Sequence, residues 1–204
     1  LLLNAWRMAH TAIERGSRDS WTVSPTDIEH AAKERKGSPF LSNAATNEFK
    51  RLLEDPAHRD ARAYILPANQ RDFPTATKFV NTLLETGVQV HRATADFTVG
   101  TNRYPAGSFV VKCAQPFRAH VLDMFEPQDH PNDFAYPGAA PTAPYDIAGW
   151  TMAFQMGVKF ERVLDGVEGM FEEIGHAQTP SAGRIENGEG AVAFFASGGM
   201  NNIY

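Results

Sequence analysis

Two short apolar runs separated by a helical pattern, between residues 63 and 91, constrain the fold more than any other feature of this chain. The first run is Ala63-Tyr64-Ile65-Leu66, whose length and composition are typical of a buried strand. Residues 74–86 then place apolar side chains at helical spacing, and Gly87 stands where a left-handed residue ends a helix. Residues 88–91 alternate as a strand does. This order predicts a βαβ unit with parallel strands.

The segments that follow extend this unit into an α/β domain. Residues 97–112 indicate a hairpin leading into another strand, and residues 116–125 indicate a helix. The alternation in residues 158–163 is typical of an edge strand, and the apolar run 191–196 is typical of a central one. We therefore predict an α/β fold with an open, mostly parallel sheet flanked by helices.

The N-terminal part differs, because its apolar positions recur at helical spacing in three pieces joined by polar loops. The sequence also opens and stops within regular patterns, which predicts an excerpt of a longer polypeptide, truncated at both ends. The predicted division is residues 1–58 as a helical tail of another domain with a linker, 59–175 as the α/β domain, and 176–204 as a linker and the next core strand of that domain.

Charge and composition exclude several classes of protein. The 19 Lys and Arg residues stand against 24 Asp and Glu, a net charge of −5, which argues against binding to a nucleic-acid backbone. No apolar run approaches the ~20 residues of a membrane-spanning helix. The single cysteine, Cys113, excludes an internal disulfide framework and a thiolate-only zinc site. No membrane span and no nucleic-acid partner are therefore expected.

Patterns for catalysis are missing from the sequence. Neither HExxH nor HxxE occurs at any of the seven histidines. The pair His120 and Asp123, and the group Glu126, Asp129, His130 and Asp133, are the nearest approaches to metal sites, and surface pairing or a solvated loop explains each more simply. Cys113 lacks the flanking glycines of a nucleophile elbow. We predict neither catalytic nor metal-binding residues within this chain.

The alternative hypothesis is that this chain binds a ligand at one edge of the predicted sheet. The turn Ser197-Gly198-Gly199 follows the expected central strand, and open parallel sheets bind ligands beyond the carboxyl ends of their strands. The polar residues that could line such an edge are Asn69, Gln70, Gln115, Ser197 and Asn201. A peptide- or ligand-binding module would use these side chains.

Three longer stretches resemble one known family. They are Asn4-Ala5-Trp6-Arg7-Met8-Ala9-His10 with residues 17–22, Ala63-Tyr64-Ile65-Leu66-Pro67 through Pro74, and residues 124–133 continued by 144–151. Together they resemble the C-terminal half of large bacterial zinc carboxypeptidases, in which a peptidase domain precedes a domain similar to class I glutamine amidotransferases. The resemblance covers nearly the whole chain and implies a flavodoxin-like or amidotransferase-like fold.

The same resemblance implies a function for the parent protein rather than for this chain. The zinc, its HxxE and His ligands and the general base would lie in an upstream carboxypeptidase domain, which would be the partner of this chain and would hydrolyse C-terminal peptide bonds. This segment would be an accessory portion of a secreted or periplasmic enzyme and inactive alone. A weaker option is an amidotransferase-type hydrolase with Cys113 as nucleophile.

Overall fold

The structure is a computed structural model that describes residues 1–34, 43–128, 133–143, 150–181 and 189–190. Three helices precede the sheet, and a short helical turn joins them to it. Their bounds are α1 Leu2–Gly16, α2 Pro25–Glu34, α3 Asn43–Leu53 and the 3-10 turn η1 Pro56–His58. The remaining elements are β1 Ala63–Leu66, α4 Phe73–Glu85, β2 His91–Ala93, β3 Phe97–Val99, β4 Asn102–Tyr104, β5 Phe109–Lys112, α5 Arg118–Phe125, α6 Met152–Gln155, β6 Glu161–Val163 and β7 Phe171–Glu173.

Local sequence signals set the helix ends. Helix α2 begins with a capping box, because the Ser24 N–H donates to Asp27 Oδ2 at 2.8 Å while the Asp27 N–H donates to Ser24 Oγ at 3.2 Å. Asp72 caps α4 by accepting from the Thr75 N–H. Gly87, just beyond the end of α4, has a φ of +87°, the left-handed conformation expected of it.

Five strands form the main sheet in the order β6-β1-β5-β2-β7, and β3 and β4 form a separate two-stranded sheet. Strand β1 pairs antiparallel with β5, Ala63 opposite Lys112, and on its other side antiparallel with β6, Ala63 opposite Val163. Strand β2 pairs antiparallel with β5 and with β7. Every pairing in the described sheets is therefore antiparallel.

The predicted open, mostly parallel sheet is wrong, and with it the flavodoxin-like or amidotransferase-like fold. Strands β1 and β2 do run in the same direction, because both are antiparallel to β5. They are not neighbours, however, since β5 lies between them. Helix α4 thus connects the outer members of a split βαβ unit. Strands β1, β2, β5 and β6, with helices α4 and α5, follow the βαββαβ order of ferredoxin-like folds, to which α6, β7 and the β3–β4 hairpin are added.

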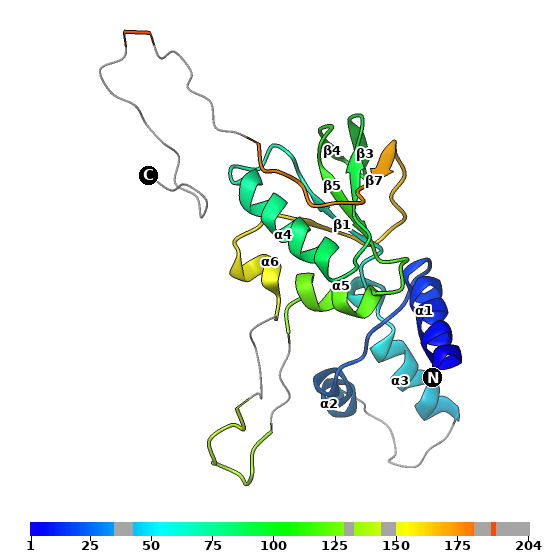
Figure 1. Cartoon of the computed structure of the whole chain (residues 1–204). Coiled ribbons are helices and arrows are strands. Elements are labelled where there is room, and N and C mark those ends of the chain that lie inside the picture. Colours follow the sequence, from blue (N-terminus) through cyan, green and yellow to red (C-terminus); the bar gives the residue numbers. More distant parts are fainter. Residues whose placement is uncertain (35–42, 129–132, 144–149, 182–188, 191–204) are drawn as a thin grey trace.

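Two apolar cores lie on opposite faces of this sheet because the side chains of β1 alternate between them. Tyr64 and Leu66 point into a core shared with α4, α5 and α6, which lie together on one face in Figure 1. Ala63 and Ile65 point into a second core with residues of the β3–β4 hairpin and of the 163–171 segment. Strand β1 is consequently buried at all four positions.

Two further expectations about the later part of the chain have different outcomes. The edge strand expected at 158–163 is confirmed, since β6 lies at one edge of the sheet. Strand β7, within the predicted α/β domain 59–175, pairs with β2 at the other edge of the sheet. The apolar run 191–196, expected to be a central strand, lies outside the described residues.

Candidate functional site

The predicted ligand residues Asn69 and Gln70 lie in the loop after β1. Asn69 is exposed. The Gln70 side-chain amide donates to the Pro67 carbonyl at 3.1 Å and to the Lys159 carbonyl at 3.2 Å, and its Oε1 accepts from the Lys159 N–H at 3.1 Å. Gln70 therefore connects this loop to Lys159, just before β6, and its side-chain amide already forms hydrogen bonds with backbone groups.

Gln115 lies at the other end of the sheet. Its buried amide accepts from the Gln89 N–H at 2.8 Å and donates to the Gln89 and Lys112 carbonyls at 3.1 and 2.6 Å. Because β1 and β5 are antiparallel, the residues that follow them leave the sheet at opposite ends. The structure therefore does not bring Gln115 together with Asn69 and Gln70, and Ser197 and Asn201 lie outside the described residues.

In the two groups weighed as metal sites, His120 and Glu126 have other partners in the described structure. His120 Nε2 lies 3.1 Å from Thr86 Oγ1 rather than pairing with Asp123. The Glu126 carboxylate is engaged by a tyrosine and an arginine, described below, and residues 129–132 lie outside the described part of the chain. Among the described residues, no three His, Cys, Asp or Glu side chains gather closely enough to share a metal ion. Within the same residues no helix is long and apolar enough to cross a membrane.

Cys113 follows β5 and is fully buried. Burial raises the pKa of its thiol to about 12, and the nearby carboxylates of Glu126 and Asp60 act in the same direction, against the lowering influence of Arg118. A thiol of this kind is protonated at neutral pH and inaccessible to substrate. Its surroundings give no support to the expected alternative of a cysteine-dependent hydrolase.

This buried thiol predicts a loss of stability in alkali. Because the pKa is raised from 9.0 to about 12 on folding, the stabilisation is complete below pH 9 and is lost as the pH rises towards 12. The slope averages about 1 kcal/mol per pH unit between pH 9 and 10 and approaches about 1.4 kcal/mol per pH unit at higher pH. Denaturant unfolding of the reduced protein at pH 8, 9 and 10 measures it. Cys113→Ala should flatten the dependence between pH 9 and 10, and an unchanged slope in that variant would contradict the assignment.

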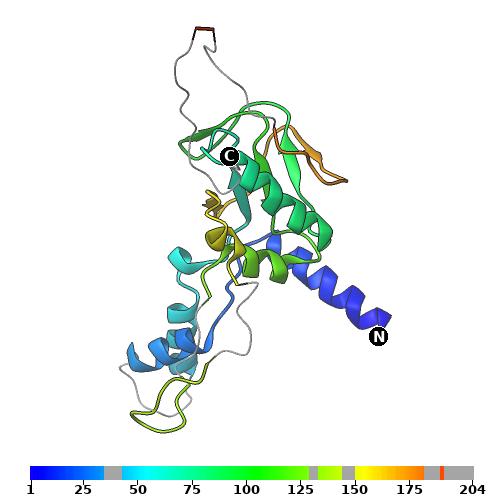
Figure 2. The same ribbon diagram turned by 60° about the vertical axis from the view of Figure 1, so that its left-hand side comes forward.

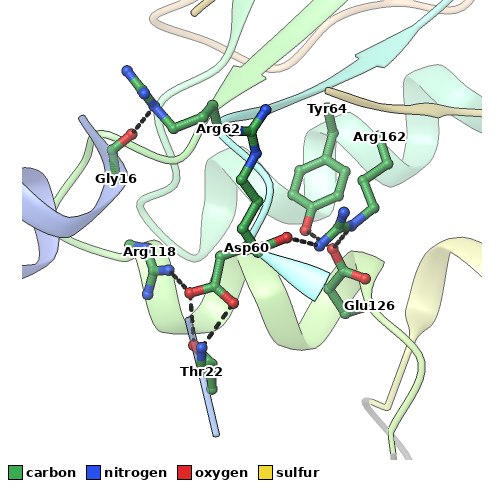
Figure 3. A network of polar contacts seen from close by, with 9 residues as sticks. Gly16, Thr22, Asp60, Arg62, Tyr64, Arg118, Glu126 and Arg162 are labelled. Carbon is green, nitrogen blue, oxygen red and sulfur yellow. Dashed lines mark hydrogen bonds and ion pairs between the residues drawn. The ribbon is translucent and has the colours of Figure 1, made fainter. Parts of the chain in front are cut away.

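The most developed polar arrangement in the described structure is a junction between the N-terminal segment and the sheet (Figure 3). We call it the polar junction, and it consists of Gly16, Asp19, Thr22, Arg59, Asp60, Arg62, Tyr64, Arg118, Glu126 and Arg162. Its residues come from the end of α1 and the segment that follows it, from β1 and the residues just before it, from the start and end of α5, and from β6.

Asp60 and Arg118 form the buried centre of the polar junction. Their side chains are 11% and 7% exposed, and Arg118 donates to Asp60 Oδ2. The same carboxylate accepts from the Thr22 N–H at 2.9 Å and from the Thr22 hydroxyl at 3.0 Å. Asp60 thus ties the segment after α1 to the start of α5.

A second, partly exposed group joins β1, β6 and the end of α5 through the carboxylate of Glu126. The Tyr64 hydroxyl of β1 donates to Glu126 Oε1 at 2.5 Å, and Arg162 Nε of β6 donates to the same oxygen at 2.7 Å. Arg162 also donates to the Arg59 carbonyl at 2.6 Å. Burial raises the pKa of the Tyr64 phenol, as does the neighbouring Glu126, so the hydroxyl remains a donor at physiological pH.

The end of α1 is held against the sheet by close packing and by two arginines. Gly16 lies so near the backbone of Cys113 that an added Cβ would stand 2.0 Å from that carbonyl oxygen. Arg62 Nε donates to the Gly16 carbonyl at 3.0 Å, and Arg59 bonds Asp19 at 3.0 Å. The base of α1 therefore has a fixed position relative to the sheet.

The rest of α1 leaves its apolar face uncovered. The exposed fractions are 86% for Leu2, 57% for Leu3, 62% for Trp6 and 41% for Ile13. Leu2, Trp6, Ala9 and Ile13 occupy the spacing of one helical stripe, which we call the α1 seam. Figure 2 shows the N-terminal part of the helix projecting away from the sheet domain. Helix α1 is therefore fixed at its C-terminal end and exposes an apolar surface along the rest of its length.

The junction residues could not be found from local patterns in the sequence. The Arg118–Asp60 and Tyr64–Glu126 contacts join positions 58 and 62 residues apart, and no spacing rule links residues at that distance. The only local signal was the unusual density of charge around residues 59–62, at the boundary between the helical segment and the first strand.

Comparisons of this chain with protein-family models, with curated proteins and with solved structures find no match.

Proposed function

We propose that this chain is an accessory, non-catalytic portion of a larger secreted or periplasmic zinc metallocarboxypeptidase, and that the α1 seam is the surface on which the peptidase domain packs. The single observation that carries the proposal is a helix whose base is fixed by the polar junction while Leu2 and Trp6 stay largely exposed. The resemblance of residues 4–10 and 124–133 to that enzyme family supplies the identity of the partner.

The size of the α1 seam favours a covalently linked partner over a second copy of the chain. One tryptophan and a few aliphatic side chains can bury roughly a few hundred Å², less than the ~800 Å² per partner of a stable interface between separate proteins. Two domains of one polypeptide associate through smaller surfaces, because the linker keeps them at a high effective concentration. A peptidase domain within the same polypeptide meets this condition.

This proposal predicts that one substitution has little effect on the stability of the isolated chain but destabilises the whole polypeptide. In the isolated chain, Trp6→Glu changes a 62% exposed side chain, so stability should change by less than about 0.5 kcal/mol. In the whole polypeptide that the gene encodes, the carboxylate would be buried against the peptidase domain, and the domain pair should lose about 2 kcal/mol or more. Thermal unfolding and the release of C-terminal amino acids from a peptide substrate measure the two effects.

Met8→Glu is the matched control for that experiment. Met8 is 74% exposed and lies about 200° around the helix from Trp6, so it should be silent in both contexts. Equal responses of the two variants in the whole polypeptide, or no response from either, would overturn the assignment of the α1 seam as a docking surface.

The alternative of a ligand-binding module at the carboxyl edge of the sheet receives no support from the geometry. An antiparallel sheet has no common carboxyl edge, and Gln70 and Gln115 use their amides for internal hydrogen bonds at opposite ends. Of the residues proposed for that edge, the three that the structure describes, Asn69, Gln70 and Gln115, therefore do not converge.

A further inference from the structure

A cleft of about 620 Å³ opens between the C-terminal end of α1, the segment that follows it, and one face of α3. Its volume lies within the ~300–1,000 Å³ of small-molecule sites. On the α3 side, Thr46, Lys50 and Leu53 line it at spacings of four and three residues, so they share one face of that helix. The cleft lies outside the polar junction, apart from Asp19, and the proposed docking does not use it.

The charges that line the cleft leave a net positive site. The cations are Arg15, Arg18 and Lys50. Of the two lining acids, Asp19 is bonded to Arg59 at 3.0 Å, on the side of the polar junction, and Glu54 lies 3.8 Å from Lys50.

Arg18 and Arg15 differ in whether an acidic side chain already forms an ion pair with them. Arg18 is paired with Glu14 at 3.1 Å, where both side chains are at least half exposed. Among the residues that the structure describes, no acidic side chain pairs with Arg15. Arg15 is therefore the cation that an incoming anion would engage.

The C-terminal end of α1 would normally repel an anion, because its last carbonyl groups carry partial negative charge. Here most of those carbonyl groups already accept a hydrogen bond. The Ser17 N–H bonds the Ile13 carbonyl at 3.0 Å, the Ser17 hydroxyl bonds the Glu14 carbonyl at 2.8 Å, and Arg62 bonds the Gly16 carbonyl at 3.0 Å. Three of the last four carbonyl groups of α1 therefore accept hydrogen bonds, which weakens the repulsion of an anion.

Besides the polar Ser20 and Thr46, the uncharged part of the lining is apolar. The indole N–H of Trp21 donates to the Asp55 carbonyl at 2.8 Å, which fixes the ring and leaves its carbon surface for contact. Val23 and Leu53 contribute aliphatic surface to the same cleft. A cation beside an anchored aromatic ring fits a molecule with an anionic head and an apolar body.

We propose that this cleft binds a small organic anion, whose charged head lies on Arg15 and whose apolar body packs on Trp21. This site goes beyond the proposed function, because it belongs to the chain itself and does not depend on a peptidase partner. The chemistry admits a carboxylate or a phosphate monoester as the head, and the experiment separates the two.

The test uses the whole chain labelled with ¹⁵N and three probes of matched size, namely phenylacetate, phenylphosphate and the neutral phenylacetamide. The indole N–H resonance of Trp21, identified as the one of three missing from Trp21→Phe, reports binding. At least one anion should shift it in a saturable manner in the ~1–10 mM range typical of ligands of about ten heavy atoms, and phenylacetamide should not. Whichever anion binds more tightly identifies the head group.

Arg15→Gln should weaken that binding about tenfold or more, since it removes a charge-assisted hydrogen bond. Arg7→Gln is the matched control, because it removes the same charge from α1 at a position that does not line the cleft, and it should bind as the parent does. Equal binding of phenylacetamide, an unchanged dissociation constant in Arg15→Gln, or no saturable shift with either anion would overturn the proposal. None of these outcomes bears on the docking of a peptidase domain.

Discussion

Replacing Gly16 with alanine should detach helix α1 from the sheet domain. The new methyl group would stand 2.0 Å from the Cys113 carbonyl oxygen, 2.3 Å from the carbonyl carbon and 2.5 Å from the Ala114 nitrogen. All three are backbone atoms next to β5, whose position is fixed by pairing with both β1 and β2. The clash therefore cannot be relieved by a side-chain rotation, and α1 has to move away.

The expected cost of Gly16→Ala is about 3 kcal/mol, at the upper end of overpacking effects, even though alanine is the better helix former. Hydrogen exchange should show faster exchange of the amides in the last two turns of α1 and in residues 17–22, while β1 and β5 stay protected. Loss of the Arg62 bond to the Gly16 carbonyl contributes to the same change.

Gly175→Ala serves as the control for this prediction. No atom lies within 4 Å of the Cβ that it would add, so its effect on the free energy of unfolding should stay within about 0.5 kcal/mol. If Gly16→Ala proved as harmless as Gly175→Ala, the close packing of α1 on the Cys113 backbone would be refuted.

The second large effect is expected at the buried centre of the polar junction. Asp60→Asn keeps the shape of the side chain but removes the charge that faces Arg118, whose own side chain is 7% exposed. An unpaired buried guanidinium is strongly unfavourable, and breaking such a pair costs about 3 kcal/mol. For a chain of 204 residues this lowers the midpoint of thermal unfolding by roughly 6–12 °C.

A double-mutant cycle with Arg118→Met isolates the interaction itself. Removing both charges should cost less than the sum of the two single changes, because neither partner is then left buried alone. Glu14→Gln is the matched control, since it neutralises an acid whose ion pair with Arg18 is 51–65% exposed, and it should change stability by less than about 0.5 kcal/mol. Strict additivity in the cycle would contradict the pairing.

Local patterns predicted the helices well because their signals lie within a few residues. The three helical pieces of the N-terminal part and the left-handed Gly87 after α4 are visible in consecutive sequence, and the structure confirms them. Each depends on backbone groups within one helical turn.

Strand pairing was not predictable in the same way. The strand–helix–strand order at 63–91 fits two parallel neighbours as well as a split unit. The choice depends on where β5 inserts, and β5 begins only at Phe109, well beyond the end of β2 at Ala93. The sequence carries no local mark for that insertion. The same limit applies to the polar junction, whose partners meet only after the sheet has formed.

The central proposal is that the peptidase chemistry belongs to a neighbouring domain and that this chain carries none of it. It is tested most directly by measuring bound zinc together with the release of C-terminal amino acids, for the isolated chain and for the whole polypeptide that its gene encodes. The account predicts about one zinc ion and measurable release for the whole polypeptide, and neither for the isolated chain. Stoichiometric zinc with activity in the isolated chain, or neither property in the whole polypeptide, would contradict it.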